Sequence, residues 1–201
     1  MGGALESARE RLFAAIDRRA EETADFVGDL VLFPSTLGNE GPAQAFVADH
    51  LRESGLDAEC WEIGESIQGW PNAGVSGVAF AERPNVSARL RGRGGGRSLV
   101  LNGHVDVVSA APLDAWATDP FSPTRVGDRL YGRGAWDMKS GLAINLMLPR
   151  LLREAGIELA GDLVVQSVIE EECTGNGALA AARRDRADAA LITESTNQRF
   201  T

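Results

Sequence analysis

Three apolar segments of strand length each end abruptly in ionisable residues, and this pattern limits the possible folds more than any other feature. In chain order the segments run into His104 and Asp106, into the glutamates 170–172, and into Glu194. Ligands gather at the carboxyl ends of strands in an open α/β sheet, so we expect these side chains to share one crevice.

Helical and strand patterns alternate in the second half of the chain. Apolar residues at helical spacing predict helices over 5–32, about 42–53, 138–154 and 177–184. Short apolar runs bounded by turn residues predict strands over 58–63, 86–90, 98–108, 162–169 and 189–193. The alternation predicts an α/β fold, with a mixed, largely parallel sheet flanked by helices. One domain over 1–201 accounts for the chain.

The glycine-rich run 92–96 raises the alternative of a phosphate-binding loop. It precedes a predicted strand, however, and it lacks the Gly-Lys-Ser/Thr ending of such loops. A hairpin turn between the strands 86–90 and 98–108 explains the run better.

The charge balance excludes several classes of partner. The chain has 20 basic and 29 acidic residues, a formal net charge of −9, so we expect neither nucleic-acid nor membrane-surface binding. No apolar run approaches the roughly 18 residues of a membrane span, and no targeting signal is evident at the start. Two distant cysteines suggest a reducing compartment. We therefore expect a cytoplasmic protein with a small-molecule substrate.

His104 and Asp106 stand two positions apart on a strand, so their side chains leave the same face. A metal-bound imidazole usually donates its other N–H to a carboxylate, which fixes the tautomer and makes a nearby Asp useful. Alone, the pair is better explained by a strand-end histidine that hydrogen-bonds a loop.

The remaining acidic residues also have ordinary explanations. Asp137, directly before a predicted helix, is the type of residue that caps a helix, and three consecutive glutamates usually form a solvated charge run. Here the glutamates end an apolar strand, where repulsion between carboxylates is unrelieved without a cation. Carboxylates with one imidazole and few thiols suit zinc, cobalt or manganese.

Four motifs extend this pattern, and they are listed here by their residues: Asn-Gly-His-Val-Asp-Val-Val at 102–108, Leu-Tyr-Gly-Arg-Gly-Ala-Trp-Asp-Met-Lys-Ser-Gly at 130–141, Ile-Glu-Glu-Glu-Cys-Thr-Gly-Asn-Gly-Ala-Leu at 169–179, and Ile-Thr-Glu-Ser-Thr at 192–196. With these motifs the chain, from Pro34-Ser35 onward, resembles the zinc-dependent family of acetylornithine deacetylases, succinyl-diaminopimelate desuccinylases, aminoacylases and related carboxypeptidases. The resemblance implies the catalytic domain of a zinc-exopeptidase-like fold.

The resemblance also implies two zinc ions, with cobalt or manganese as substitutes. Asp137 would bridge the two ions, His104 and Glu194 would complete the first site, and Glu172 would bind the second.

Glu171 would then be the general base, and Asp106 would orient His104. A slip of one residue within the glutamate run would instead make Glu170 the base and Glu171 the ligand.

Against the family pattern the chain lacks several parts. Relatives supply a late histidine to the second metal and a lid domain that forms homodimers, so we expect 1–201 to be the N-terminal part of a catalytic domain. The other histidine, His50, is expected on a solvated helix face.

The expected activity is hydrolysis of the amide bond of N-acyl amino acids or small peptides by a metal-activated water with a Glu base. The alternatives are a truncated, noncatalytic metal-binding or interaction domain, and an unrelated α/β protein with coincidental strand-end carboxylates.

Overall fold

The computed structural model describes residues 2–196. Its α-helices are α1 (Gly2–Arg18), α2 (Ala20–Val31), α3 (Gly41–Glu53), α4 (Ser140–Glu154) and α5 (Asn176–Arg184). Its strands are β1 (Ala58–Trp61), β2 (Asn85–Leu90), β3 (Leu99–His104), β4 (Thr124–Val126), β5 (Arg129–Tyr131), β6 (Leu163–Val168) and β7 (Ala189–Ile192). Short helical turns lie at Glu65–Gly69, Leu113–Ala115 and Ala135–Lys139.

Five of these strands form one sheet in the order β1-β2-β6-β3-β7. The β3–β6 and β3–β7 pairs are parallel, whereas the β1–β2 and β2–β6 pairs are antiparallel. Only β2 therefore runs against the others, which confirms the predicted mixed, largely parallel sheet. Every residue of β6 is buried, as expected for an apolar strand at the centre of a sheet covered on both faces.

The predicted hairpin between β2 and β3 is wrong, because β6 lies between them. The run 92–96 instead follows the segment that leads into β6: Arg93 N donates to Leu159 O (2.9 Å) and Gly94 N donates to Ala160 O (3.0 Å). The strand patterns of β2 and β3 follow each other in sequence, which suggested that they pair. A strand that is apolar on both faces, such as β6, buries more apolar surface at the centre of the sheet.

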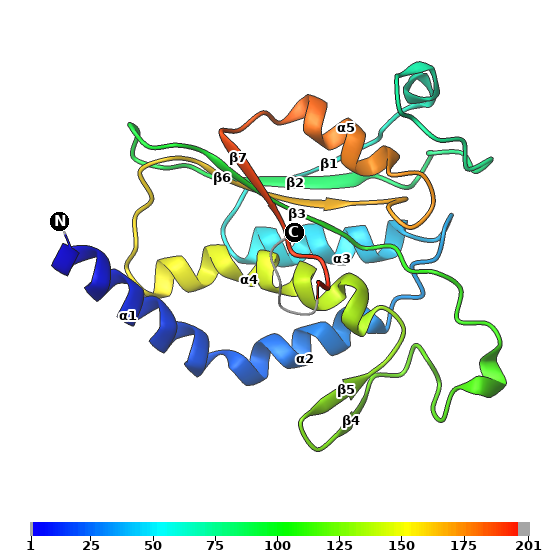
Figure 1. Ribbon diagram of the computed structural model, residues 1–201, viewed down its shortest axis with the longest axis horizontal. Coiled ribbons are helices and arrows are strands. Elements are labelled where there is room, and N and C mark those ends of the chain that lie inside the picture. Colours follow the sequence, from blue (N-terminus) through cyan, green and yellow to red (C-terminus); the bar gives the residue numbers. More distant parts are fainter. Residues whose placement is uncertain (1, 197–201) are drawn as a thin grey trace.

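Helices cover the two faces of the sheet unequally (Figure 1). α3 and α4 lie along one face and α5 along the other. On β3 the alternation of side chains matches this arrangement, since a Cβ added at Gly103 would meet Met138 and Leu142. The next residue back, Asn102, points to the opposite face, beside α5.

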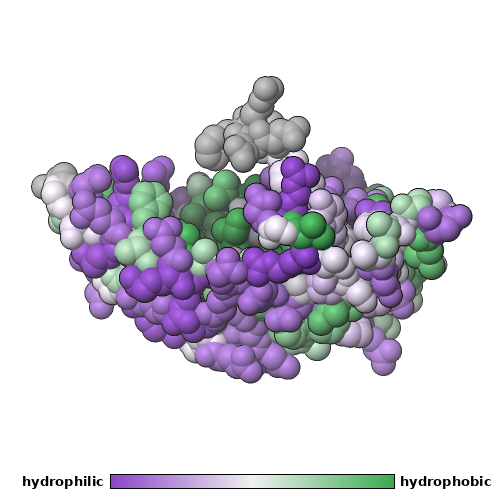
Figure 2. All heavy atoms as spheres, turned by 90° about the horizontal axis from the view of Figure 1, so that it is seen from below, coloured by the Kyte–Doolittle hydropathy of each residue, from purple (hydrophilic) through white to green (hydrophobic). Residues whose placement is uncertain are grey.

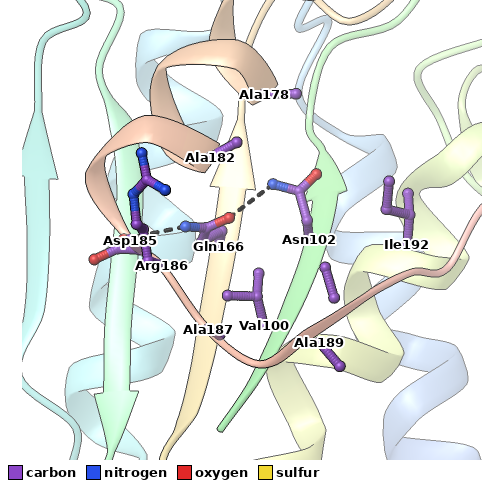
Figure 3. A pocket seen from close by; sticks show the side chains of 11 residues that line it. Val100, Asn102, Gln166, Ala178, Ala182, Asp185, Arg186, Ala187, Ala189 and Ile192 are labelled. Atoms are coloured by element: carbon purple, nitrogen blue, oxygen red, sulfur yellow. Dashed lines mark hydrogen bonds between the residues drawn. The ribbon is translucent and has the colours of Figure 1, made fainter.

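A hollow of about 420 Å³ lies on the α5 face (Figure 3). Asn102 Nδ2 donates to Gln166 Oε1 (2.9 Å), and Gln166 Nε2 donates to Asp185 Oδ2 (3.0 Å), so a line of polar groups crosses from β3 through β6 to the end of α5. The rest of the lining is mainly alanine and aliphatic side chains. None of the sequence-predicted site residues lines this hollow.

The long helix predicted over 5–32 is two helices that meet at Arg19, whose backbone leaves helical geometry (φ −108°, ψ 7°). Its guanidinium pairs with Glu22 (2.7 Å) and Glu154 (2.9 Å). A single non-helical residue barely alters the apolar spacing, so the pattern could not reveal the break. The side of the molecule that carries these helices is mostly hydrophilic, with scattered apolar patches (Figure 2).

The strands β4 and β5 form a separate hairpin that the sequence patterns did not predict. Each strand has three residues, which is too short for an alternation of apolar and polar residues to be recognised. Within residues 2–196, none of the helices is both long and apolar enough to cross a membrane.

Replacing Leu146 by alanine should destabilise the fold. Leu146 of α4 is fully buried in the core, so Leu146→Ala should lower the free energy of unfolding by about 2–5 kcal/mol. Ile144 on the same helix is 56% exposed, and Ile144→Ala should change it by no more than about 0.5 kcal/mol. Urea unfolding of both variants checks this, and equal losses would contradict the assignment of the buried face of α4.

Candidate metal centre

The carboxyl ends of β3, β6 and β7 lie side by side, and the residues that follow them meet there. In the parallel register His104 is opposite Val168, and Asn102 is opposite Ile192. Glu194 stands two residues beyond Ile192, at the level of His104, and the glutamate run begins two residues beyond Val168, at the level of Asp106. The residues that follow these three strands therefore come together at this end of the sheet, as predicted.

His104 is 1% exposed, and the contacts of its ring determine which nitrogen carries the proton. Nδ1 lies 2.9 Å from the carbonyl oxygen of Asp106 and 3.6 Å from its carboxylate. Because a carbonyl oxygen only accepts, Nδ1 is a protonated nitrogen, and in the neutral ring Nε2 carries the lone pair. The bond that orients His104 thus goes to the backbone of Asp106, not to the predicted carboxylate.

The lone pair of His104 Nε2 faces a group of carboxylates. Nε2 lies 3.2 Å from Glu194 Oε1, 3.3 Å from Asp137 Oδ1 and 3.7 Å from Glu171 Oε2. It is buried and has no hydrogen-bond partner. Ligand atoms of His104, Asp137 and Glu172 all lie within 4.8 Å of one another.

This donor set fits a divalent metal ion. A nitrogen lone pair beside carboxylate oxygens is unfavourable unless a cation lies between them, and one imidazole with carboxylates is a ligand set that zinc accepts. Among residues 2–196 no lysine or arginine pairs with Asp137, Glu171, Glu172 or Glu194. The buried, unpartnered Nε2 is the atom that most needs a metal here.

Ionisation in the cluster shows the same excess of negative charge. Burial raises the pKa of Glu172 and of Glu194 above the usual value; the neighbouring carboxylates add to the rise, and His104 opposes it. Burial opposes the charging of His104, but the carboxylates of Asp106, Glu171 and Glu194 raise its pKa overall. These directions describe anionic groups that repel each other and attract a cation.

Asp106 connects the ends of two strands. Its Oδ1 accepts the N–H of Glu171 (3.2 Å) and its Oδ2 accepts the N–H of Glu172 (3.1 Å). The same residue orients His104 through its carbonyl oxygen. Burial raises the pKa of the Asp106 carboxyl, and these two donors counteract the rise. Asp106 therefore fixes the histidine and the glutamates relative to each other.

Asp137 lies on the turn Ala135–Lys139, where its own backbone is not helical (φ −115°, ψ 104°) and its bond to Met138 is cis. No side chain caps the start of α4, so the capping role considered for Asp137 is not seen. Lys139 holds the turn against the end of α2, since its Nζ donates to Leu30 O (2.9 Å) and Phe33 O (2.7 Å). Burial lowers the pKa of Lys139 to about 7.

The three glutamates face different ways. Glu170 is fully buried with φ +61°, and Arg83 donates to it at 3.0 Å. Glu171 and Glu172 are exposed and lie at the cluster. The geometry thus separates Glu170 from His104 and Asp137.

The expectation for His50 is wrong, and two residues near the site were not predicted. His50 is half-buried, with its ring stacked 4.1 Å from that of Phe26, so it does not lie on a solvated face. Sequence reasoning missed Arg83 and Lys139. For Lys139 a signal existed, because a lysine two residues after Asp137 lies inside the quoted motif; for Arg83 there was none.

A known protein family matches the segment of the chain that contains these residues. The family described as "Peptidase family M20/M25/M40" matches residues 100–200, half of the chain, which include every residue from His104 to Glu194. The chain belongs to peptidase family M20/M25/M40. The family assignment confirms the resemblance to zinc-dependent exopeptidases and deacylases.

Individual relatives in this family are hydrolases of amide bonds by name. The N-formyl-4-amino-5-aminomethyl-2-methylpyrimidine deformylase of Bacillus subtilis (strain 168) is 33% identical over 189 residues, which cover 90% of this chain and 40% of the relative. The succinyl-diaminopimelate desuccinylase of Leptothrix cholodnii is 33% identical over 183 residues, which cover 88% and 44%. The chain thus spans about two fifths of these relatives.

A solved structure, human carnosine dipeptidase 1, has a TM-score of 0.75 and 22% sequence identity over 91% of this chain and 40% of its own. This likeness confirms the fold.

Zinc should stabilise the chain through this cluster. A ligand that binds only the folded state at 100 times its Kd raises the free energy of unfolding by about 2.7 kcal/mol. We expect that gain from Zn²⁺ and its reversal by a chelator, as measured by urea unfolding at constant pH.

Matched variants locate the effect. Asp137→Asn should weaken Zn²⁺ binding by at least about tenfold, because even partners outside the ligand set cost 10–100-fold in metal affinity. Asp128→Asn changes an exposed aspartate in the β4–β5 turn and should leave the Kd unchanged. Equal affinity in the two variants would place the zinc elsewhere.

Proposed function

We propose that this chain provides the metal-binding and proton-transferring residues of an M20-family amide hydrolase. The observation that carries the proposal is the unpartnered Nε2 of buried His104, directed at the carboxylates of Asp137, Glu194 and Glu171. Relatives named as deformylase and desuccinylase support the class of reaction.

His104, Asp137 and Glu194 would hold one cation, and Glu172, together with Asp137, would contribute to a second. The distances from His104 Nε2 to Asp137 and Glu194 and the grouping with Glu172 support this division. A bound divalent cation supplies Lewis acidity, which polarises a carbonyl and lowers the pKa of water.

Glu171 would act as the general base. Its carboxylate is 46% exposed, so water and substrate can reach it, and its Oε2 lies 3.7 Å from His104 Nε2. The Asp106 carboxylate accepts the backbone N–H of Glu171, and this hydrogen bond limits the movement of Glu171. Glu171 would take a proton from the attacking water and deliver it to the leaving amine.

The proposed substrates are small N-acyl amines or dipeptides. Relatives named for a formyl amide, a succinyl amide and carnosine define the panel to be assayed. The assay follows release of the free amine from an N-formyl amine, an N-succinyl amino acid and a dipeptide, with Zn²⁺ or Co²⁺ added.

A noncatalytic metal-binding domain is the second candidate. It is favoured by the ligand set, because His104 is the single histidine in the cluster found within residues 2–196. Metal content separates the two candidates: two ions per chain with turnover support the hydrolase, whereas one ion without turnover on the whole panel supports the binding domain.

Glu171→Gln should remove the base and keep the metal. General-base participation contributes about 10²–10⁴-fold, so kcat should fall by that factor while Zn²⁺ content stays at the wild-type value. Glu158→Gln, an exposed change shortly before β6 and so at the opposite end of that strand, should leave both values unchanged. Unchanged turnover in Glu171→Gln would refute the assignment of the base.

A further inference from the structure

A buried ionic network lies directly behind the glutamate run. Arg83 Nη2 and Nε bind Glu40 Oε1 (2.6 Å) and Oε2 (2.8 Å), a two-bond pairing, and Arg83 Nη1 binds Glu170 Oε1 (3.0 Å). Both carboxylates are fully buried and the arginine side chain is 4% exposed. Charged groups are rarely buried to this extent unless they are paired as these are.

The other hydrogen-bonding positions of Glu170 are also filled. Ser76 Oγ donates to Oε1 (2.8 Å), Thr174 Oγ1 donates to Oε2 (2.8 Å), and Asn176 Nδ2 donates to Oε2 at 3.3 Å. A carboxylate with this many donors has one favourable position. Arg83 and Ser76 belong to the long loop between β1 and β2, so that loop holds Glu170 from outside the sheet.

The backbone of Glu170 begins the turn that presents the next two glutamates. Its carbonyl oxygen accepts the N–H groups of Thr174 (3.0 Å) and Gly175 (2.8 Å), which closes the turn. On the opposite side Asp106 accepts the N–H groups of Glu171 and Glu172. The turn is therefore fixed by Arg83 behind it and by Asp106 in front of it.

We propose that Arg83 is a positioning residue: by holding Glu170 it sets the place of Glu171 and Glu172 at the metal cluster. This inference rests on the proposed function, which makes Glu172 a ligand and Glu171 the base. Glu40 contributes to this positioning, because its two bonds to Arg83 fix the plane of the guanidinium and leave Nη1 directed at Glu170. Lysine keeps the charge of Arg83 but cannot bind both carboxylates in this planar arrangement.

The test compares Arg83→Lys and Arg83→Met with the wild-type chain, using Co²⁺ alone as the probe. Co²⁺ titration with its visible absorption spectrum reports affinity and ligand geometry without turnover. We expect Arg83→Met to weaken Co²⁺ binding by about 10–100-fold and to change the spectrum, as substitutions behind metal ligands do. Arg83→Lys should recover part of the affinity. With turnover as a second readout, kcat should fall, and KM should change by a smaller factor.

Leu146→Ala is the control for loss of stability, because Leu146 lies in the core and makes none of these contacts. It should lower the urea midpoint without changing the Co²⁺ affinity or spectrum of the folded fraction. If the Arg83 variants do not fold, Ser76→Ala removes a single donor to Glu170 and should shift the Co²⁺ spectrum in the same direction by less.

The outcomes separate this inference from the proposed function. Wild-type chain that binds Co²⁺ without turnover defeats the hydrolase and leaves the Co²⁺ comparison to decide the role of Arg83. A chain that binds no Co²⁺ defeats both. Folded Arg83→Lys and Arg83→Met that match the wild type in affinity and spectrum overturn the inference, as does an unchanged spectrum in Ser76→Ala when the Arg83 variants do not fold.

Discussion

The hydrogen bond between His104 Nδ1 and the carbonyl oxygen of Asp106 is the constraint on which the rest of the site depends. It fixes the proton on one nitrogen and thereby points the lone pair of the other at three carboxylates. Without this bond the ring could turn or carry its proton on Nε2, and the carboxylates would then have an ordinary hydrogen-bond donor. With it, the neutral ring offers these carboxylates no N–H, and a bound cation would satisfy the lone pair and the carboxylates together.

The carboxylates at this end of the sheet have two different environments. Behind the glutamate run, Arg83 neutralises part of the charge of Glu40 and Glu170 inside the protein. At the cluster, Glu171 and Glu172 have no such basic partner among the described residues, and Lys139 directs its Nζ to backbone carbonyls of the α2 end. Basic side chains thus lie close by, but their hydrogen bonds go to other groups, which preserves the attraction of the cluster for a metal.

Much of this arrangement could be predicted from sequence, because strand ends are visible as the points where apolar runs stop. His104, Glu171, Glu172 and Glu194 could be placed at one sheet edge without knowing the strand order. Which of residues 170–172 is buried, and which two lie at the cluster, could not be derived from the residues themselves, since three identical neighbours give no local signal. The buried position of Glu170, which sets it apart from Glu171 and Glu172, involves a bond from Arg83, 87 residues away in the chain. The wrong hairpin has a similar cause, because strand order is decided by burial of the whole sheet.

The double use of the Asp106 carboxylate links parts of the site that come from different strands. One side chain accepts from the amides of both Glu171 and Glu172, and its own main chain orients the histidine. A fluctuation that frees the glutamate turn must therefore also disturb the end of β3. We therefore expect the two strand ends to open to solvent as a single unit, with the amides at 171 and 172 sharing one opening equilibrium that a bound metal ion would suppress.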